Sequence, residues 1–171
     1  MCKYALITGG ASGLGLELSK LFAKDGIDLF LVSSNIANLN KAKEDLEKEY
    51  NIHVEILALD LTNPQNFHKV KEYSDEHKLD VHYLVNNAGY GDQADLVDMD
   101  TDKQVKMIDL NCNAPLALMC DYIKDFKKAD EDRYILNISS IAAFYPGPHM
   151  CTYHASKAFL LNMNALMKSM A

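Results

Sequence analysis

The chain has 171 residues, of which 49% are hydrophobic, and a formal net charge of −7 at pH 7. This length suits one compact core, so we expect a single domain over residues 1–171. The acidic balance argues against a nucleic-acid-binding surface, because phosphate contacts need clustered lysine and arginine, and we interpret it as a solubility feature. The four cysteines and six histidines show no metal-ligand spacing, so no metal site is predicted.

The amino-terminal segment is already strand-like from Lys3 to Thr8 and has no basic region followed by a long apolar stretch, as a signal peptide has. No stretch reaches the roughly 18 apolar residues of a membrane span. We therefore expect a soluble, cytoplasmic protein that does not enter a membrane and whose cysteines are reduced thiols.

Strand-like and helix-like segments alternate along the chain. Short apolar runs predict strands over 4–7, 29–32 and 54–59. A helix is expected between Gly13 and Gly26, and it carries Leu14, Leu18, Leu21 and Phe22 at helical spacing. A longer helix is expected next, with Leu39, Ala42, Leu46 and Tyr50 on one face.

The second half continues the alternation. Pro64 suits the first turn of a third helix, with Phe67 and Val70 facing inward. Strands are predicted over 81–85 and 134–138, and a loop over 91–100. A long helix is predicted from about Thr101 to Lys128, with a bend at Pro115. A loop over 139–152 leads to a last helix that starts near Tyr153 and continues to residue 171.

The strands are apolar throughout instead of alternating, which is typical of a parallel sheet covered by helices on both faces. The regular βα alternation predicts an α/β protein with a doubly wound parallel sheet and three α/β/α layers. We expect about five strands in the order 3-2-1-4-5.

A glycine-rich turn joins the first strand to the first helix, at Thr8-Gly9-Gly10-Ala11-Ser12-Gly13-Leu14-Gly15. Glycines permit a tight turn, and the helix N-terminus offers free N–H groups to a pyrophosphate. The alternative is an ordinary glycine-rich strand-to-helix turn. A P-loop is excluded, because no Lys-Ser/Thr pair follows the glycines.

Polar residues follow two further strands. Asp60 ends the third predicted strand and Asn86 the fourth. In a doubly wound sheet, ligands bind outside the carboxyl ends of the strands. These side chains either face a ligand or cap a turn, and for Asp60 the two interpretations are about equal.

A phenol and an ammonium group stand four residues apart at Tyr153 and Lys157, on one helix face. The spacing is common by chance. Its position gives it weight, because it begins a helix just after a strand that ends in Ser139-Ser140, again on the ligand edge.

Taken together, these features resemble the short-chain dehydrogenase/reductase family. The resemblance covers the chain from Lys3 to Ala171 and rests on five motifs in register: Thr-Gly-x-x-x-Gly-x-Gly at 8–15, Asn86-Asn87-Ala88-Gly89, Asn111, Asn137-Ile138-Ser139-Ser140, and Tyr153-x-x-x-Lys157. It implies a Rossmann fold and an NAD(P)-dependent oxidoreductase that interconverts a carbonyl and a secondary alcohol. The partner it implies is a small carbonyl or alcohol substrate.

The resemblance also implies the site residues. The implied catalytic set is Asn111, Ser140, Tyr153 and Lys157, and Ser140 is preferred over Ser139 for its distance from the tyrosine. By the same resemblance, Asn111 holds a helix distortion and a water in the proton path. On sequence alone, a polar residue satisfied within a helix is the favoured interpretation of Asn111. The implied cofactor-binding residues are Gly9, Ala11, Ser12, Gly13, Leu14, Gly15, Ser33, Ser34, Asp60, Leu61, Asn87, Ala88, Gly89, Tyr153 and Lys157.

The implied chemistry is physically coherent. Tyr153 supplies or removes the proton, and a nearby Lys157 ammonium favours the phenolate, since a free phenol has a pKa of about 10. Ser140 bonds the substrate oxygen where charge develops. NADP is preferred over NAD, because Ser33 and Ser34 stand where NAD-preferring members often carry a carboxylate.

The chain departs from the family at its C-terminal end. Members usually add further strands and a mobile segment that closes over the substrate. We therefore expect a formed cofactor site, poor turnover by these 171 residues, and an uncovered apolar edge at the fifth strand. Some residues suggest a moderately apolar ligand, although plain loop packing is the favoured explanation for them: Tyr90, Ile141, Phe144, Tyr145, His149 and Met150.

Two other functions stay open: a non-catalytic or truncated dinucleotide-binding domain, and another doubly wound enzyme such as a methyltransferase. A homo-oligomer is also expected. The last helix is apolar nearly all round and is therefore buried on more than one side, through Phe159, Leu160, Leu161, Met163, Leu166, Met167 and Met170.

Overall fold

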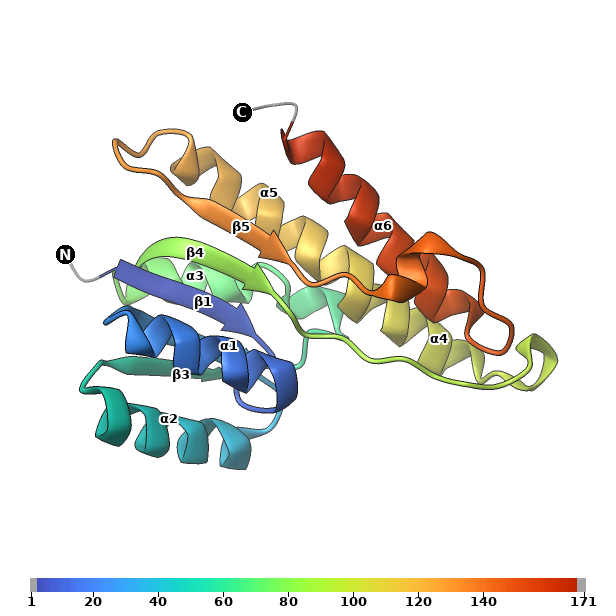
Figure 1. Cartoon of the computed structure of the whole chain (residues 1–171), viewed down its shortest axis with the longest axis horizontal. Helices are drawn as coiled ribbons and strands as arrows, with labels where there is room; N and C mark the ends of the chain where they lie inside the picture. Colours follow the sequence, from blue (N-terminus) through green and yellow to red (C-terminus); the bar gives the residue numbers. More distant parts are fainter. Residues whose placement is uncertain (1–2, 169–171) are drawn as a thin grey trace.

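A computed structural model of the chain describes residues 3–168, without the side chains of residues 96 and 165–168. Five parallel strands form one sheet in the order β3-β2-β1-β4-β5, as predicted (Figure 1). The strands are β1 (Lys3–Thr8), β2 (Asp28–Ser33), β3 (Val54–Ala58), β4 (Asp80–Asn86) and β5 (Tyr134–Asn137). The α-helices are α1 (Gly13–Lys24), α2 (Ile36–Tyr50), α3 (Lys69–Glu76), α4 (Thr101–Ile108), α5 (Ala114–Phe126) and α6 (Cys151–Lys168).

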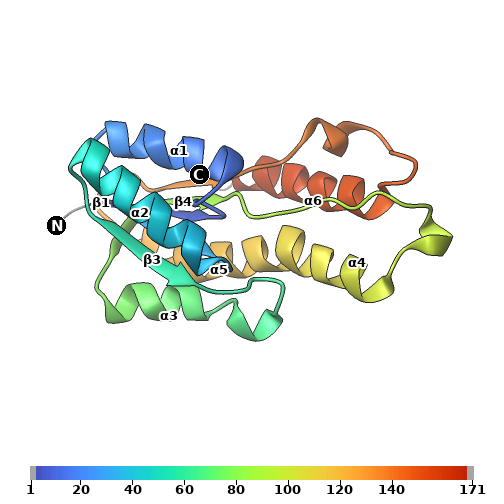
Figure 2. The same cartoon turned by 90° about the horizontal axis from the view of Figure 1, so that it is seen from below.

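Helices cover both faces of the sheet, as the apolar strands require. Figure 2 shows α1 and α2 on one side of the strands and α3 and α5 on the other. Successive side chains of a strand point to opposite faces. Ala5 and Ile7 of β1 therefore enter the core beneath α1 and α2, while Leu6 enters the core beneath α3 and α5. No helix within residues 3–168 is long and apolar enough to cross a membrane.

Helix α1 differs from its prediction. Its buried residues are the small Gly15, Ser19 and Ala23, whereas Leu14 and Leu21 are 57% and 61% exposed. Small side chains let α1 lie close to the turn that precedes it. Ser19 Oγ stabilises this approach by donating to the carbonyl oxygens of Gly10 and Gly15, at 3.0 and 2.9 Å.

The third helix starts later than predicted. Pro64 opens a 3-10 turn, Pro64–Asn66, and α3 begins only at Lys69. Asn63 Oδ1 caps this turn by accepting a hydrogen bond from the backbone N–H of residue 65, at 3.1 Å. Phe67 and Val70 are buried, as predicted.

The predicted long helix is real, but its distortion does not lie at Pro115. A π-helical turn, Asp109–Asn113, separates α4 from α5, and the N–H of Ala114 donates to the carbonyl of Asp109. Pro115 falls in the first turn of α5, where its missing N–H costs nothing. Such π turns are frequent at functional sites.

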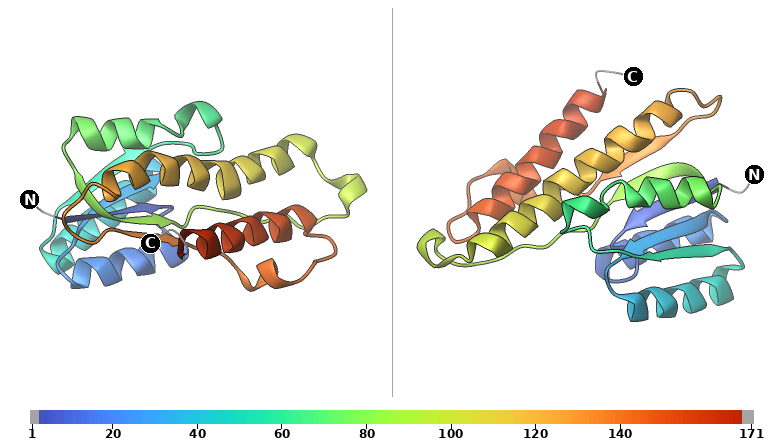
Figure 3. Two further views of the ribbon diagram at one scale, coloured as in Figure 1. Left: turned by 90° about the horizontal axis from the view of Figure 1, so that it is seen from above. Right: turned by 180° about the vertical axis from the view of Figure 1, so that it is seen from behind.

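Helix α6 begins at Cys151, two residues before the predicted start, and runs beside α4 and α5 (Figure 3). Leu160 is buried, and Met163 packs against the core beneath α5. The predictions for Leu166, Met167 and Met170 fall outside the described side chains. Two short 3-10 turns, Leu96–Asp98 and Ile141–Phe144, interrupt the predicted loops.

Strand β5 pairs only with β4 among the described residues and forms one edge of the sheet. Its Tyr134 and Leu136 are 53% and 45% exposed. The predicted uncovered apolar edge is therefore present in residues 3–168.

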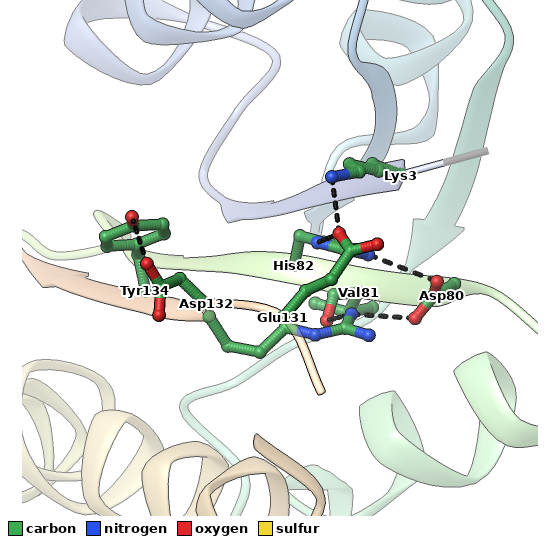
Figure 4. Close-up of polar contacts among 8 residues, drawn as sticks. Lys3, Asp80, Val81, His82, Glu131, Asp132 and Tyr134 are labelled. Atoms are coloured by element: carbon green, nitrogen blue, oxygen red, sulfur yellow. Dashed lines mark hydrogen bonds and ion pairs between the residues drawn. The ribbon is translucent and has the colours of Figure 1, made fainter. Parts of the chain in front are cut away.

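The amino ends of β1, β4 and β5 carry a group of charges that we call the amino-end cluster: Lys3, Asp80, His82, Glu131 and Arg133. Lys3 Nζ donates to Glu131 at 2.6 Å, and His82 Nε2 lies 3.1 Å from an Asp80 oxygen (Figure 4). Arg133 donates to the other Asp80 oxygen at 2.7 Å. These contacts fasten the start of β5 to its neighbours in the sheet.

Candidate functional site

A cavity of about 600 Å³ opens at the carboxyl ends of the strands. It runs from the glycine-rich turn, past the ends of β2 and β3, to the first turns of α6. Its lining residues are Gly9, Ser12, Gly13, Leu14, Gly15, Val32, Ser33, Ser34, Leu59, Asp60, Leu61, Thr62, Asn87, Ala88, Gly89, Tyr90, Leu110, Ile138, Ser139, Ser140, Tyr153 and Lys157. All the predicted cofactor-binding residues except Ala11 are among them.

Ala11 is the exception, because it is buried in the core beneath α1 and α2. The glycine-rich turn reverses direction between Gly9 and Gly13, so its middle residue points into the protein. Its neighbour Ser12 is exposed and lines the cavity. The predicted role of Ala11 as a cofactor contact is therefore not supported by its position.

The glycines of the turn are required by its geometry. Gly9 and Gly13 adopt positive φ angles of 67° and 52°, which side chains disfavour. A Cβ on Gly15 would lie 2.1 Å from the carbonyl oxygen of Gly9, so a side chain there displaces backbone. At these three glycine positions, backbone and not a side chain faces the cavity.

The first turn of α1 suits an anion. Its N-cap residue, Ser12, makes no side-chain capping bond, and no acidic residue lies in the first turn. The backbone N–H groups at a helix N-terminus have no partner within the helix. They face the cavity beside Gly13 and can hold the pyrophosphate of a dinucleotide.

The wall opposite the turn is pinned by Thr8. Its Oγ1 accepts hydrogen bonds from the N–H groups of Asn87 and Ala88, both at 3.0 Å. Asn87 Nδ2 in turn donates to the Thr8 carbonyl at 2.9 Å. The Asn87 side chain therefore holds the wall in place, and the backbone of residues 87–89 forms the lining.

The ends of β2 and β3 form the far part of the cavity. Asp60 serves both roles that its sequence position suggested: it lines the cavity, and its Oδ1 accepts a hydrogen bond from the N–H of Thr62 at 2.9 Å. Ser33 and Ser34 also line this part. The end of β2 places no carboxylate here.

Asn111 is fully buried in the π turn and does not line the cavity. Its Oδ1 accepts a hydrogen bond from the N–H of Tyr90 at 3.2 Å, and its Nδ2 donates to the Tyr90 carbonyl at 2.9 Å. Nδ2 also donates to Ser156 Oγ at 3.0 Å. Asn111 therefore ties the loop after β4 to α6, and it acts on the site through its neighbours.

Ser139 and Ser140, which follow β5, differ in their hydrogen bonds. Ser139 Oγ donates its proton to the carbonyl of Lys157 at 2.8 Å. Ser140 Oγ accepts a hydrogen bond from the N–H of Ala142 at 3.1 Å, so its own proton remains free to donate. This difference favours Ser140 as the donor to a ligand.

Tyr153 and Lys157 lie on one face of α6 and both line the cavity. Lys157 Nζ donates to the carbonyl of Ile138 at 2.8 Å and lies 5.8 Å from the centroid of the Tyr153 ring. Within residues 3–168 the Tyr153 hydroxyl has no hydrogen-bond partner. Both groups thus keep donors for a ligand.

The electrostatics single out Lys157. Its side chain is 5% exposed, and burial lowers its pKa below the usual 10.5. The Cys112 thiol lies near it and is also buried, which raises the pKa of Cys112 to about 11 despite the opposing effect of the ammonium. A buried, unpaired cation at a cavity wall is a typical feature of functional sites.

Five residues that line the cavity were not predicted from the sequence to do so: Val32, Leu59, Thr62, Leu110 and Ile138. Val32, Leu59 and Ile138 were recognised only as strand residues. Their places at the carboxyl ends of strands were the available signal. Of the residues expected to shape a substrate pocket, Tyr90 lines the cavity, whereas Ile141, Phe144 and Tyr145 are exposed beside it.

Comparison with known proteins gives a family match over nearly the whole chain. The profile of the family described as short chain dehydrogenase matches residues 3–171. A very-long-chain 3-oxoacyl-CoA reductase from Vanderwaltozyma polyspora is 30% identical over 167 residues, which cover 92% of this chain and 48% of that protein. The chain thus spans about half the length of the curated relatives it matches.

Solved structures show the same fold. A short-chain dehydrogenase from Sphingobium yanoikuyae in complex with NADPH is similar with a TM-score of 0.87 and 31% identity, over 95% of this chain and 62% of that one. A 4-hydroxyisoleucine dehydrogenase complexed with NADH gives a TM-score of 0.86 and 25% identity, over 96% of this chain and 66% of that one. Similar structures therefore bind either nicotinamide cofactor.

Proposed function

Because the chain belongs to the short-chain dehydrogenase family, we propose that it carries the cofactor site and the proton donor of an oxidoreductase that interconverts a carbonyl and a secondary alcohol. One observation carries the proposal. Ser140, Tyr153 and Lys157 line the same cavity as the glycine-rich turn, with the serine proton and the phenol free. The turn would hold the dinucleotide, and Ser140, Tyr153 and Lys157 would act on the substrate and the cofactor in the same cavity.

The residues divide the chemistry among them. A bound nicotinamide supplies the hydride for carbonyl reduction and accepts it in the reverse direction. Tyr153 donates its phenolic proton to the oxygen of the substrate, and Ser140 donates a hydrogen bond to the same oxygen as charge develops. Lys157 keeps two N–H donors after its bond to Ile138, and these suit cofactor hydroxyls and the phenol. Its positive charge favours the phenolate.

NADP is the proposed cofactor form. The end of β2 offers two hydroxyls, Ser33 and Ser34, and no carboxylate that would repel a 2′-phosphate. We expect the wild type to bind NADPH more tightly than NADH. Ser33→Asp should weaken NADPH by about tenfold and spare NADH, as measured by cofactor fluorescence titration. Equal affinities in the wild type would contradict the NADP assignment.

Tyr153→Phe tests the catalytic assignment. The variant should lose about 10²–10⁴-fold in kcat for ketone reduction by the protein that carries this chain, and should keep the wild-type Kd for NADPH. Tyr134→Phe is the matched control, because Tyr134 is an exposed tyrosine on β5 outside the cavity.

Three outcomes separate the alternatives. Cofactor binding without turnover in the wild-type protein that carries this chain supports a non-catalytic dinucleotide-binding domain. Binding of S-adenosylmethionine in place of NADPH supports a different doubly wound enzyme. Equal kcat values for Tyr153→Phe and the wild type remove Tyr153 from the mechanism.

A further inference from the structure

The loop over residues 140–150 reaches the cavity at both of its ends. At its start, Ser140 lines the cavity beside Tyr153. At its end, Met150 lies against the loop after β4: a Cβ on Gly91 would be 3.1 Å from both Met150 Cε and the Tyr153 ring. The conformation of the 140–150 loop therefore determines where Ser140 and Met150 lie relative to the phenol of Tyr153.

His154 holds the middle of this loop from the next position on α6. Its Nδ1 lies 2.7 Å from the carbonyl oxygen of Tyr145. A carbonyl only accepts, so Nδ1 must carry the proton, as it does in one neutral tautomer and in the imidazolium. The rings of Tyr145 and His154 also meet edge to face, with their centroids 5.5 Å apart. The contact is therefore possible in both charge states of His154.

The His154 ring also packs closely against residue 147. A Cβ on Gly147 would lie 2.0 Å from Nε2 and 2.3 Å from Cε1 of His154. Gly147 does not have a positive φ angle, so a left-handed backbone conformation is not the reason for glycine there. A side chain at residue 147 would therefore displace the His154 ring from its place against the loop.

A separate contact fastens the end of the loop. The N–H of Ala94 donates to the carbonyl of His149 at 2.8 Å, and the His149 ring pairs with Asp95. This joins the 140–150 loop to the segment that follows Gly91. His154 does not line the cofactor cavity, whereas Tyr153 beside it does.

We propose that His154 is a positioning residue for the substrate side of the site. It clamps the 140–150 loop through the Tyr145 carbonyl and Gly147, and so places Ser140 and Met150 on either side of Tyr153. The proposal rests on the proposed function for its effect on catalysis. It assigns His154 a role in binding the carbonyl substrate and no role in binding the dinucleotide.

Two readouts on the protein that carries this chain test the clamp. The first is the rate of limited chymotrypsin cleavage after Phe144, which is exposed and directly precedes the clamped Tyr145. The second is the set of KM, kcat and NADPH Kd values for ketone reduction. We expect His154→Ala to speed cleavage and to raise KM by about tenfold each, with the NADPH Kd unchanged within about twofold. His154→Asn, whose amide N–H can reach the Tyr145 carbonyl, should restore both values to within about threefold of the wild type.

A double variant separates the clamp from a general structural role. Gly147→Ala alone should speed cleavage, because its methyl group meets the His154 ring. In the His154→Ala background the same change should add little, since the ring is gone. Additive effects of Gly147→Ala and His154→Ala would overturn the steric part of the proposal.

The remaining outcomes are distinct. Unchanged cleavage in His154→Ala overturns the clamp, whatever the activity. If His154→Ala is cleaved faster but its KM is unchanged, the role of His154 in substrate binding is overturned. The same conclusion follows if the NADPH Kd rises as much as KM does. A wild type that binds no NADPH and reduces no ketone contradicts the proposed function and with it the role in substrate binding, and the cleavage rates then still decide the clamp.

Discussion

The amino ends and the carboxyl ends of the strands differ in whether their charged side chains are paired. At the amino ends of the strands, Arg133 and His82 both contact Asp80, and Lys3 contacts Glu131 (Figure 4). At the carboxyl ends, Lys157 is buried against a backbone carbonyl and takes part in no ion pair of the described residues. One end uses its charges to fasten strands, and the other keeps a cation available.

The pKa shifts of Asp80 and Lys157 show the same contrast between a paired and an unpaired charge. Burial alone would raise the pKa of Asp80, but hydrogen bonds from Arg133 and His82 outweigh it and lower the pKa. Burial lowers the pKa of Lys157 without a carboxylate to oppose it. A satisfied charge stabilises the fold, whereas an unsatisfied one at a cavity indicates a place for a ligand.

The largest effect is expected at the glycine-rich turn of the carboxyl end. Gly15→Ala places a methyl group 2.1 Å from the Gly9 carbonyl, so backbone must move. We expect a loss of about 3 kcal/mol in the free energy of unfolding and about 100-fold weaker NADPH binding. Urea unfolding and fluorescence titration measure the two effects.

Gly26→Asn is the control for that variant. Gly26 has a positive φ of 74° and no atoms near its Cβ position, and asparagine tolerates this conformation better than most residues. It should keep wild-type NADPH affinity. A Gly15→Ala protein with wild-type stability and affinity would show that the turn is not as tight as described.

A substitution in the amino-end cluster should lower the free energy of unfolding and leave NADPH binding unchanged. Arg133→Met leaves Asp80 without its main partner in a partly buried setting, and we expect a loss of about 2 kcal/mol. The NADPH Kd should stay at its wild-type value, because the cluster lies at the opposite end of the sheet. Chemical unfolding and a titration on the same sample measure both.

Lys3→Met provides the comparison within the cluster. Its pair with Glu131 is exposed on both sides, and such pairs contribute little. We expect no measurable change in the unfolding midpoint. A loss as large as that of Arg133→Met would mean that the cluster acts as a unit.

Much of this architecture was predictable because buried parallel strands have a strong pattern. The strand order, the two-sided helical cover and the edge position of β5 follow from apolar runs separated by helices. The cavity was predictable for a related reason: Asp60, Ser140 and the glycine-rich turn each follow a strand, and carboxyl ends of parallel strands meet at one edge.

Contacts between distant segments were not predictable in this way. The inward turn of Ala11, the exposed Leu14 and the distortion at residues 109–113 all depend on packing that the local pattern does not encode. The bend was expected at Pro115 because proline breaks helices. The chain instead forms a π turn just before it, which places Asn111 against the Tyr90 backbone.

A smaller effect is expected from Lys157→Met. Removing a buried ammonium group should raise the free energy of unfolding by about 1 kcal/mol, while NADPH binding weakens by about tenfold. Because burial lowers the folded-state pKa, the destabilisation by Lys157 is fully present below that pKa and disappears as the pH rises toward about 10.4. The stability gap between the variant and the wild type should therefore narrow at high pH, as measured by urea unfolding. A gap that is constant with pH would contradict the burial of the charged group.

The smallest effect is expected at low pH in the amino-end cluster, where the titration of Asp80 changes the stability. The pKa of Asp80 is lowered in the folded chain, so its contribution is present above its unfolded pKa of about 3.9 and is lost as the pH falls through the folded value. The stability difference between the wild type and Arg133→Met should therefore be constant from about pH 5 to 7 and shrink below about pH 3.9, by less than about 1 kcal/mol. Because the comparison is between two variants, carboxylates that titrate equally in both cancel. A difference that does not shrink below about pH 3.9 would mean that Arg133 stabilises the sheet through its bond to the Val81 carbonyl, at 2.8 Å, and not through Asp80.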